Sequence, residues 1–139
     1  MSELVLKVAA VLIFKDNSVL LVRHVNSKHI ENIYGLPGGK IDAGEADIDA
    51  AKRELAEETG LITTAESLVR LPTLWKANVR FKDGNTRTCS MRVFLCRQYT
   101  GAVQGTEQEI PEWIPLERLP NLSILPNVRE AIAEAKKML

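Results

Sequence analysis

The stretch RELAEETG, residues 53–60, places three carboxylates within five positions. In a helix, Glu57 and Glu58 lie three and four residues beyond Glu54, so the three side chains share one face. Like charges at this spacing destabilise a helix unless something compensates them. Grouped carboxylate oxygens are the hard ligands that Mg²⁺ and Mn²⁺ prefer. The sequence therefore predicts a divalent metal site here, and the alternative is an ordinary solvated acidic face.

A glycine-rich segment precedes these glutamates. Residues 34–45, YGLPGGKIDAGE, contain four glycines and one proline. This composition allows unusual backbone angles or a close approach of the backbone to a ligand. Backbone groups near the carboxylates would suit a Mg²⁺ site that bridges to substrate phosphates. Arg53 is predicted to face away from the glutamates and to pair with Glu45, which would hold the loop against the helix.

The spacing of apolar residues predicts the helix that carries the glutamates. Ile48, Ala51 and Leu55 recur at spacings of three and four, which predicts an amphipathic helix over residues 46–59. Gly60 is a natural stop for this helix. The apolar stripe lies opposite the acidic face, so the glutamates should project away from the core.

Four β-rich segments and a second amphipathic pattern complete the chain. Turn residues at 15–18 and 82–85 separate the strands in pairs, so each pair is predicted to form a hairpin. The predicted strands cover residues 4–14, 19–25, 68–81 and 86–99, and the predicted second helix covers residues 128–139. This order predicts an α/β fold in which a mixed sheet has one helix on each face.

Composition limits the classes of partner. The length of 139 residues predicts one domain, residues 1–139. Eighteen basic residues balance eighteen acidic residues, and the lack of a basic excess argues against a nucleic-acid partner. No segment is apolar and long enough to span a membrane, and no targeting leader is evident, so the expected compartment is the cytoplasm. Cys89 and Cys96 lack the spacing of a zinc site or redox pair.

Residues 39–61 fit the pattern G-x5-E-x7-R-E-U-x-E-E-x-G-U, in which U is a bulky aliphatic residue. The fixed positions are Gly39, Glu45, Arg53, Glu54, Leu55, Glu57, Glu58, Gly60 and Leu61. This pattern resembles the Nudix box, the signature of the Nudix hydrolase superfamily, and a looser resemblance covers most of the chain. The resemblance implies the Nudix fold, an α/β/α sandwich with a mixed central sheet and a loop-helix-loop catalytic motif. It also implies Mg²⁺-dependent hydrolysis of a nucleoside diphosphate linked to another group.

The same resemblance implies roles for the residues of the box. The implied metal ligands are the Gly39 carbonyl, Glu54, Glu57 and Glu58. The implied ion is Mg²⁺, with Mn²⁺ as a substitute, and Arg53 with Glu45 is the implied structural salt bridge. A further acid often precedes the tryptophan by six residues, which is Glu107 here, with Glu109 as the alternative. The catalytic base is expected to be Glu54 or Glu57 first and Glu107 second.

Substrate choice depends on residues outside the box. The ADP-ribose branch usually has a proline about sixteen residues past the box, where this chain has Lys76 and Ala77. The marks of the dinucleoside-polyphosphate and coenzyme A branches are also missing. The chain therefore resembles the MutT-like branch, which implies a nucleoside triphosphate pyrophosphohydrolase, with oxidised dGTP and nucleotide-pool cleansing as the specific expectation. A nucleotide-sugar or dinucleoside-polyphosphate hydrolase is one alternative, and a non-catalytic nucleotide-binding module is another.

Three residues outside the box are candidate substrate-binding residues. In MutT-like proteins an asparagine before the last helix can read an oxidised guanine, and Asn127 occupies that place; the alternative is that Asn127 caps the helix. Arg23 is a candidate to bind the triphosphate or the base; the alternative is that Arg23 is an ordinary surface arginine. Tyr34 is a candidate for base stacking.

Other aromatic residues and the histidines carry weaker signals. Trp75 and Phe81 share the base-stacking hypothesis with Tyr34, although aromatic side chains more often belong to the core. His24 and His29 have no partner at a useful spacing, so both are predicted to be surface residues.

Overall fold

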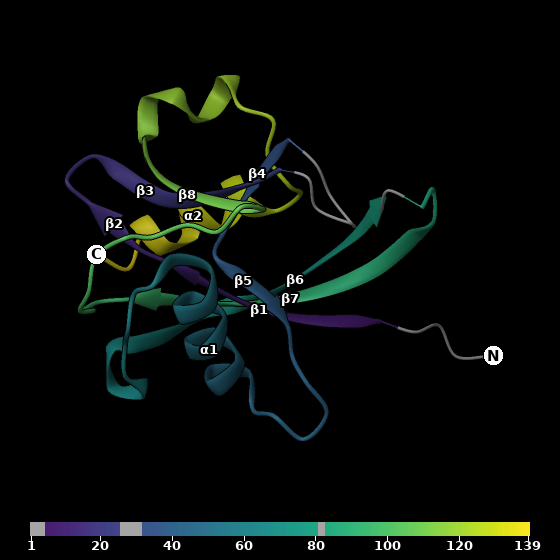
Figure 1. The fold of residues 1–139 in the computed structure, drawn as a ribbon, viewed down its shortest axis with the longest axis horizontal. Helices are drawn as coiled ribbons and strands as arrows, with labels where there is room; N and C mark the ends of the chain where they lie inside the picture. Colours follow the sequence, from purple (N-terminus) through teal and green to yellow (C-terminus); the bar gives the residue numbers. More distant parts are fainter. Residues whose placement is uncertain (1–4, 26–31, 81–82) are drawn as a thin grey trace.

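A four-stranded mixed sheet forms the centre of the molecule (Figure 1), with the strand order β5-β1-β7-β6. The structure, a computed structural model, describes residues 5–25, 32–80 and 83–139, so Phe81 and His29 lie outside the described residues. The strands are β1 (Leu6–Leu12), β5 (Gly38–Lys40), β6 (Leu68–Arg80) and β7 (Thr86–Cys96). β1 runs parallel to β7 and antiparallel to β5, which makes the sheet mixed as predicted.

A second, antiparallel sheet is built around β3. Its strands are β2 (Phe14–Lys15), β3 (Ser18–His24), β4 (Ile33–Gly35) and β8 (Glu109–Pro115). β3 pairs with each of the other three strands. β8 escaped the sequence prediction because it contains Pro111 and Pro115. Within the described chain its ladder partner is β3, and prolines are tolerated in a strand whose other edge is unpaired.

The predicted hairpin between the first two strands is wrong in its larger part. β1 does not pair with β3, since the chain passes from one sheet to the other near Ile13. Only the two residues of β2, Phe14 and Lys15, pair back onto β3. The apolar run of β1 is buried on both faces, as in a central strand, and its neighbours are distant in the sequence. The second predicted hairpin, β6 with β7, is present.

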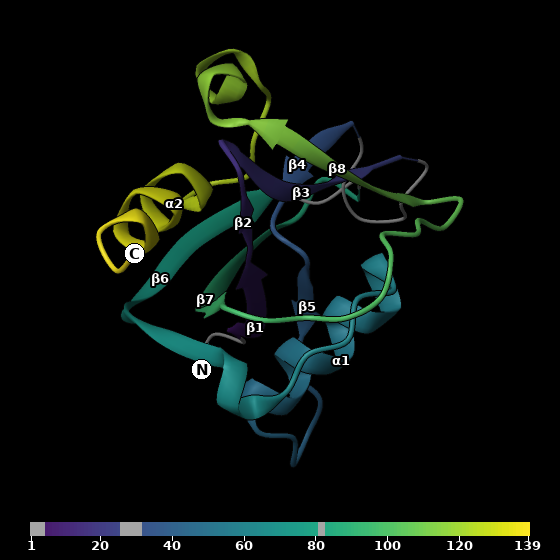
Figure 2. The same cartoon turned by 90° about the vertical axis from the view of Figure 1, so that its left-hand side faces the viewer.

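Two helices cover opposite faces of the central sheet. α1 (Asp47–Thr59) packs Ala51 and Leu55 into a core with Phe94, whereas α2 (Val128–Lys136) packs Ile132 into a separate core cluster. Figure 2 shows the strands between the two helices, which confirms the predicted sandwich. Gly60 has a φ of 78° and ends α1 as predicted, because a left-handed residue stops the helix.

The remaining helical segments are short. Two 3-10 turns, η1 (Ala65–Ser67) and η2 (Leu116–Asn121), join strands and helices. In the described ranges, no helix has both the length and the apolar character needed to cross a bilayer.

Candidate active site

Two glycines in β5 bring the loop into contact with both β1 and α1. A Cβ atom on Gly38 would lie 2.5 Å from the carbonyl oxygen of Ala9 in β1. A Cβ atom on Gly39 would lie 2.5 Å from the carboxyl carbon of Glu54 in α1. Each contact is closer than real Cβ atoms come, so only glycine fits the present arrangement. The backbone of Gly39 therefore lies directly against the Glu54 carboxylate.

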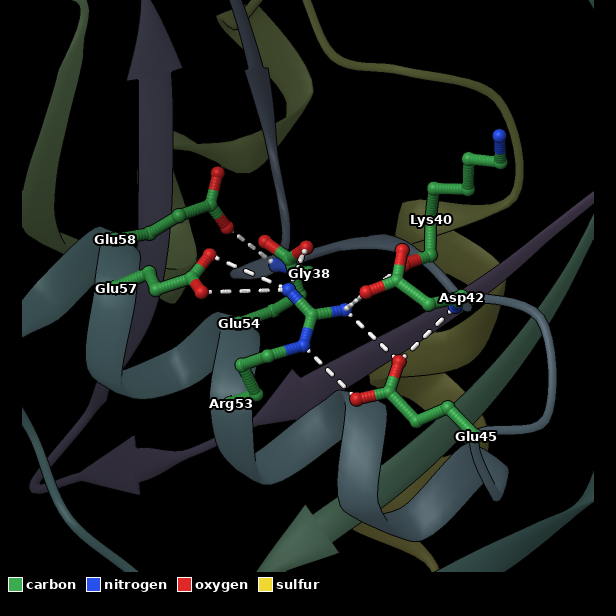
Figure 3. A network of polar contacts seen from close by, with 8 residues as sticks. All are labelled: Gly38, Lys40, Asp42, Glu45, Arg53, Glu54, Glu57 and Glu58. Atoms are coloured by element: carbon green, nitrogen blue, oxygen red, sulfur yellow. Dashed lines mark hydrogen bonds and ion pairs between the residues drawn. The ribbon is translucent and has the colours of Figure 1, made fainter.

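Arg53 ties the glycine-rich loop to α1 (Figure 3). Its Nε and Nη2 each donate to a different oxygen of Glu45, at 2.9 Å, so the ion pair expected from the sequence is present and bidentate. Nη2 also donates to the carbonyl oxygen of Lys40 at 3.1 Å. Glu45 in turn accepts a hydrogen bond from the Asp42 amide at 3.0 Å. These contacts fix the entrance to the helix.

Arg53 also contacts the acidic face of α1, contrary to the interpretation from the sequence. Its Nη1 donates to Glu54 at 2.9 Å and lies 3.3 Å from Glu57. The prediction that Arg53 faces away from the glutamates was wrong, because a long guanidinium reaches residues on both sides of its own position. The Arg53 guanidinium offsets the charge of two of the three carboxylates, which would otherwise repel one another.

The three glutamates differ sharply in environment. Glu58 is only 6% exposed and accepts a hydrogen bond from the Gly38 amide at 2.6 Å. Burial raises the pKa of Glu58 to about 9, although the Gly38 amide opposes the shift. Burial also raises the pKa of Glu54, against the opposing effect of Arg53. The Glu57 side chain is 57% exposed.

The donor set fits a hard divalent cation, but the ligands are held apart. Among the residues that the structure describes, no three acidic, histidine or cysteine side chains converge closely enough to hold a metal ion. The reason is that Arg53 holds Glu54 and Glu57 while the Gly38 amide holds Glu58. Glu58 is a desolvated carboxyl group with a single amide donor, and the Gly39 backbone lies against Glu54. Carboxylate and carbonyl oxygens of this kind suit Mg²⁺ or Mn²⁺.

A pocket of about 540 Å³ opens beside these carboxylates. Its walls come from the central sheet, β3, α1 and the start of α2, and they are mostly apolar. The polar or charged side chains in its lining are those of His24, Lys40, Glu54, Glu58, Trp75, Arg87, Glu109 and Asn127. Carboxylates that could hold a cation, together with Asn127 in the same apolar pocket, suit a ligand with a metal-bound anionic part and a flat polar part.

The loop acid that reaches the pocket is Glu109, the alternative in the sequence prediction. Glu109 lines the pocket and its charge raises the pKa values of Glu54 and Glu58. Glu107 is exposed and does not line the pocket. Glu109 begins β8 opposite His24 of β3, so pairing with β3 brings its side chain inward. Counting six residues back from Trp113 selects Glu107, which lies outside β8. Strand pairing begins only at Glu109.

Arg23 and Tyr34 do not line the pocket. Both side chains contact Glu112 of β8: the Tyr34 hydroxyl donates at 2.8 Å, and Arg23 Nε lies at 3.4 Å. Arg23 is the residue before His24 on β3, and neighbouring residues of a strand point to opposite faces. On this strand, His24 rather than the predicted Arg23 lines the pocket.

Asn127 lines the pocket and does not cap α2 with its side chain. It occupies the N-cap position with a φ of 70°, yet it makes no side-chain capping hydrogen bond. Instead, its Nδ2 donates to the carbonyl oxygen of Lys76 in β6 at 3.0 Å. This bond orients the amide, and the capping alternative is not supported. Trp75, next to Lys76, also lines the pocket, and its Nε1 is buried with no hydrogen-bond partner in the described chain.

We expect Glu45→Gln to weaken the joint between loop and helix in a pH-dependent way. The hydrogen bond from Arg53 lowers the pKa of Glu45 from its ordinary 4.5 to about 2. Because the folded-state pKa is the lower one, the stabilisation is complete above pH 4.5 and is lost as the pH falls towards 2. Thermal unfolding should show wild type above Glu45→Gln at pH 7 and the two converging near pH 2. A gap of constant size down to pH 2 would contradict this role.

Comparison with known proteins places this geometry in a family. A family model described as the NUDIX domain matches residues 4–135. The chain is 29% identical over 124 residues to the 8-oxo-dGTP diphosphatase of Escherichia coli (strain K12), covering 89% of this chain and 90% of that protein. It is 41% identical over 113 residues to the ADP-ribose pyrophosphatase of Methanocaldococcus jannaschii, covering 81% of this chain and 63% of that protein.

Solved structures show the same fold. The structure of a MutT Nudix hydrolase from Burkholderia pseudomallei has a TM-score of 0.76 and 24% identity, covering 95% of this chain and 98% of that chain. The Nudix domain of NrtR from Shewanella oneidensis, solved with ADP ribose, has a TM-score of 0.70 and 23% identity, covering 99% and 89% of the two chains. The chain therefore belongs to the Nudix hydrolase family, MutT-like enzymes among them, which use divalent metal ions to cleave the pyrophosphate bonds of nucleotides.

Proposed function

We propose that the protein is a Mg²⁺-dependent pyrophosphohydrolase of purine nucleoside triphosphates, with oxidised dGTP as the preferred candidate. The observation that carries the proposal is that Glu54, Glu58, Glu109 and Asn127 line the same pocket. Its volume of about 540 Å³ lies within the ~300–1,000 Å³ range of small-molecule sites. This chain also covers 90% of the 8-oxo-dGTP diphosphatase of E. coli, against 63% of the ADP-ribose pyrophosphatase.

The carboxylates would form the phosphate end of the site. In the proposal, Glu54, Glu57, Glu58 and the Gly39 carbonyl hold the ion, which when bound would neutralise the diphosphate and lower the pKa of a water molecule. Arg53 would lose its contacts with Glu54 and Glu57 and keep its ion pair with Glu45. The loop would therefore stay in place while the two glutamates reorient towards the ion. Glu58 would lose its own proton and its hydrogen bond from the Gly38 amide, and would then bind the ion.

A carboxylate beside the phosphates would take the proton from the attacking water. Glu54 and Glu57 are the first candidates from the sequence, and Glu109 joins them because it lines the pocket with Glu54 and Glu58. Its pocket position supports Glu109 over Glu107 in this role. The nucleoside would lie against the apolar walls near Trp75 and Asn127, where the oriented amide of Asn127 can hydrogen-bond to a base.

ADP-ribose is the second candidate substrate. The relative with 41% identity is an ADP-ribose pyrophosphatase, although this chain covers only 63% of it. The pocket floor also continues beyond Trp75 along the sheet, through Ala77 and Cys89 to Val79. In this second proposal, the terminal ribose would lie against these sheet residues.

Initial rates across a nucleotide panel test the proposal. With Mg²⁺, we expect the highest kcat/KM for a purine triphosphate, with 8-oxo-dGTP above dGTP, and release of pyrophosphate. Glu57→Gln should lower kcat/KM by about 10²-fold, the low end for loss of a carboxylate that acts in the transition state. Glu66→Gln, an exposed residue in η1, is the matched control and should leave the rate unchanged.

The panel also separates the alternatives. A higher kcat/KM for ADP-ribose than for every triphosphate would replace the first candidate by the second. Tight binding of a nucleotide without metal-dependent turnover of any panel member would support the non-catalytic module and overturn the proposal.

A further inference from the structure

His24 is one of the polar side chains of the pocket that neither the box nor the proposed chemistry uses. We propose that His24 contacts the substrate directly and recognises its nucleoside part, an inference that rests on the proposed function. The sequence offered no reason to choose His24, and its neighbour Arg23 was the candidate from this strand. Side chains alternate between the two faces of β3. His24 therefore lines the pocket, whereas Arg23 points to the other face and pairs with Glu112.

The backbone of His24 is held from both sides. β3 lies between β4 and β8, and His24 is opposite Ile33 on one side and Glu109 on the other. The His24 carbonyl also accepts a hydrogen bond from the Asn32 amide. A side chain on a strand paired at both edges has a fixed starting direction, which is what a selective contact to a ligand requires.

The imidazole lies near Gly35, which also approaches Leu125 in the segment before Asn127, and Glu109 is the cross-strand neighbour of His24. A Cβ atom on Gly35 would lie 3.9 Å from His24 Nε2 and 2.8 Å from Leu125 Cδ1, so the ring lies close to the segment that leads into Asn127. The carboxylates contact the same loop further along, at Gly38 and Gly39. Three residues separate Gly35 from Gly39, so the two Cα atoms lie at most ~13 Å apart.

The ring has the right chemistry for uncharged polar groups. His24 is half-buried, and burial lowers its pKa, which keeps the imidazole neutral at neutral pH. A neutral imidazole has one donor and one acceptor. Within the described ranges, neither ring nitrogen has a hydrogen-bond partner; the same pocket is lined by the apolar Leu36 and Leu125, and Glu109 lies across the strand from His24. Ribose hydroxyls and the polar edge of a base match this donor and acceptor pair.

Two substitutions separate a polar contact from packing. His24→Asn keeps one donor and one acceptor, whereas His24→Leu keeps bulk and removes both. The measurement is the dissociation constant of AMP, of GMP and of inorganic pyrophosphate, by titration calorimetry of the whole chain with Mg²⁺. We expect His24→Leu to weaken both monophosphates about tenfold, the size of one lost hydrogen bond, and His24→Asn to stay within about threefold of wild type. Pyrophosphate binding should not change in either variant.

The outcomes that overturn the inference are distinct. Unchanged monophosphate binding in His24→Leu would exclude the contact. Equal weakening in both variants would make His24 a packing residue, and parallel weakening of pyrophosphate would move it to the phosphate end. The binding measurement needs no turnover, so a protein that binds monophosphates through His24 yet cleaves no triphosphate would refute the proposed function and keep this inference.

Discussion

Gly39→Ala is expected to remove almost all turnover while the protein stays folded. The new Cβ atom would lie 2.5 Å from the Glu54 carboxyl carbon and 2.6 and 2.7 Å from its two oxygens. The end of a flexible side chain can move aside at little cost in stability, which we expect to be below about 1 kcal/mol. If Glu54 and the Gly39 carbonyl hold the ion as proposed, the moved carboxylate can no longer share it with the loop. We expect kcat/KM to fall about 10³-fold, within the range for a lost catalytic group.

Two other glycines of the same segment are matched controls. Gly38→Ala would place its Cβ 2.5 Å from the Ala9 carbonyl oxygen in β1, where the backbone cannot yield cheaply, so we expect a loss of about 3 kcal/mol in stability. Gly44 has a φ of 79° and open space around it, so Gly44→Ala should cost roughly 1–2 kcal/mol and leave kcat unchanged. Rates and melting temperatures of the three variants give the comparison. Near-normal turnover in Gly39→Ala would refute the close approach as a functional requirement.

Glu58→Gln is expected to remove the proton release that accompanies metal binding and to lower turnover strongly. With a pKa of about 9, Glu58 carries a proton at pH 7 in the metal-free protein, and a ligand carboxylate must lose it. Calorimetric titration of Mg²⁺ in Tris and in PIPES, whose ionisation enthalpies differ, measures that proton. Wild type should release about one proton at pH 7 and almost none at pH 10, and kcat/KM of the variant should fall about 10³-fold. Identical heats in both buffers for wild type would contradict the assignment.

The same carboxyl group sets the pH dependence of metal-free stability. Its folded-state pKa lies above the ordinary 4.5, so its stabilising contribution is complete below pH 4.5 and is lost as the pH rises towards 9. The slope in that window is at most about 1.4 kcal/mol per pH unit for one proton. Glutamine cannot ionise, so Glu58→Gln should melt above wild type at pH 8 without metal. With Mg²⁺ the order should reverse, because the wild-type site alone gains the ion. A variant that melts below wild type in both conditions would contradict this account.

The sequence predicted the parts of the site that depend on local spacing. Helical periodicity and Gly60 predicted α1, and the charges of Arg53 and Glu45 predicted an ion pair that closes a short loop. These interactions are local, so the sequence alone specifies the geometry. The turn of Arg53 Nη1 towards Glu54 and Glu57 was not predictable, because it depends on side-chain reach rather than on position along the helix.

Features that depend on strand partners were harder to predict. Alternation identifies a strand but not its neighbour, so β1 was paired with β3 instead of β5 and β7. A shift of one residue on β3 exchanges Arg23 for His24, because each step turns the side chain to the other face. Pairing between β3 and β8 likewise decided between Glu107 and Glu109. Such choices become visible only when the pairing is known.

The position of β1 has a consequence for biosynthesis. It is synthesised well before its parallel partner β7, since Leu6 lies opposite Cys89 in the pairing. Until β7 is made, the apolar segment LKVAAVL has an open edge and can associate with other chains. Pairing over such a sequence separation also makes closure slow, in the range of ~ms to s for sheets of this kind. The nascent chain should therefore depend on chaperones most during synthesis of residues 40–90.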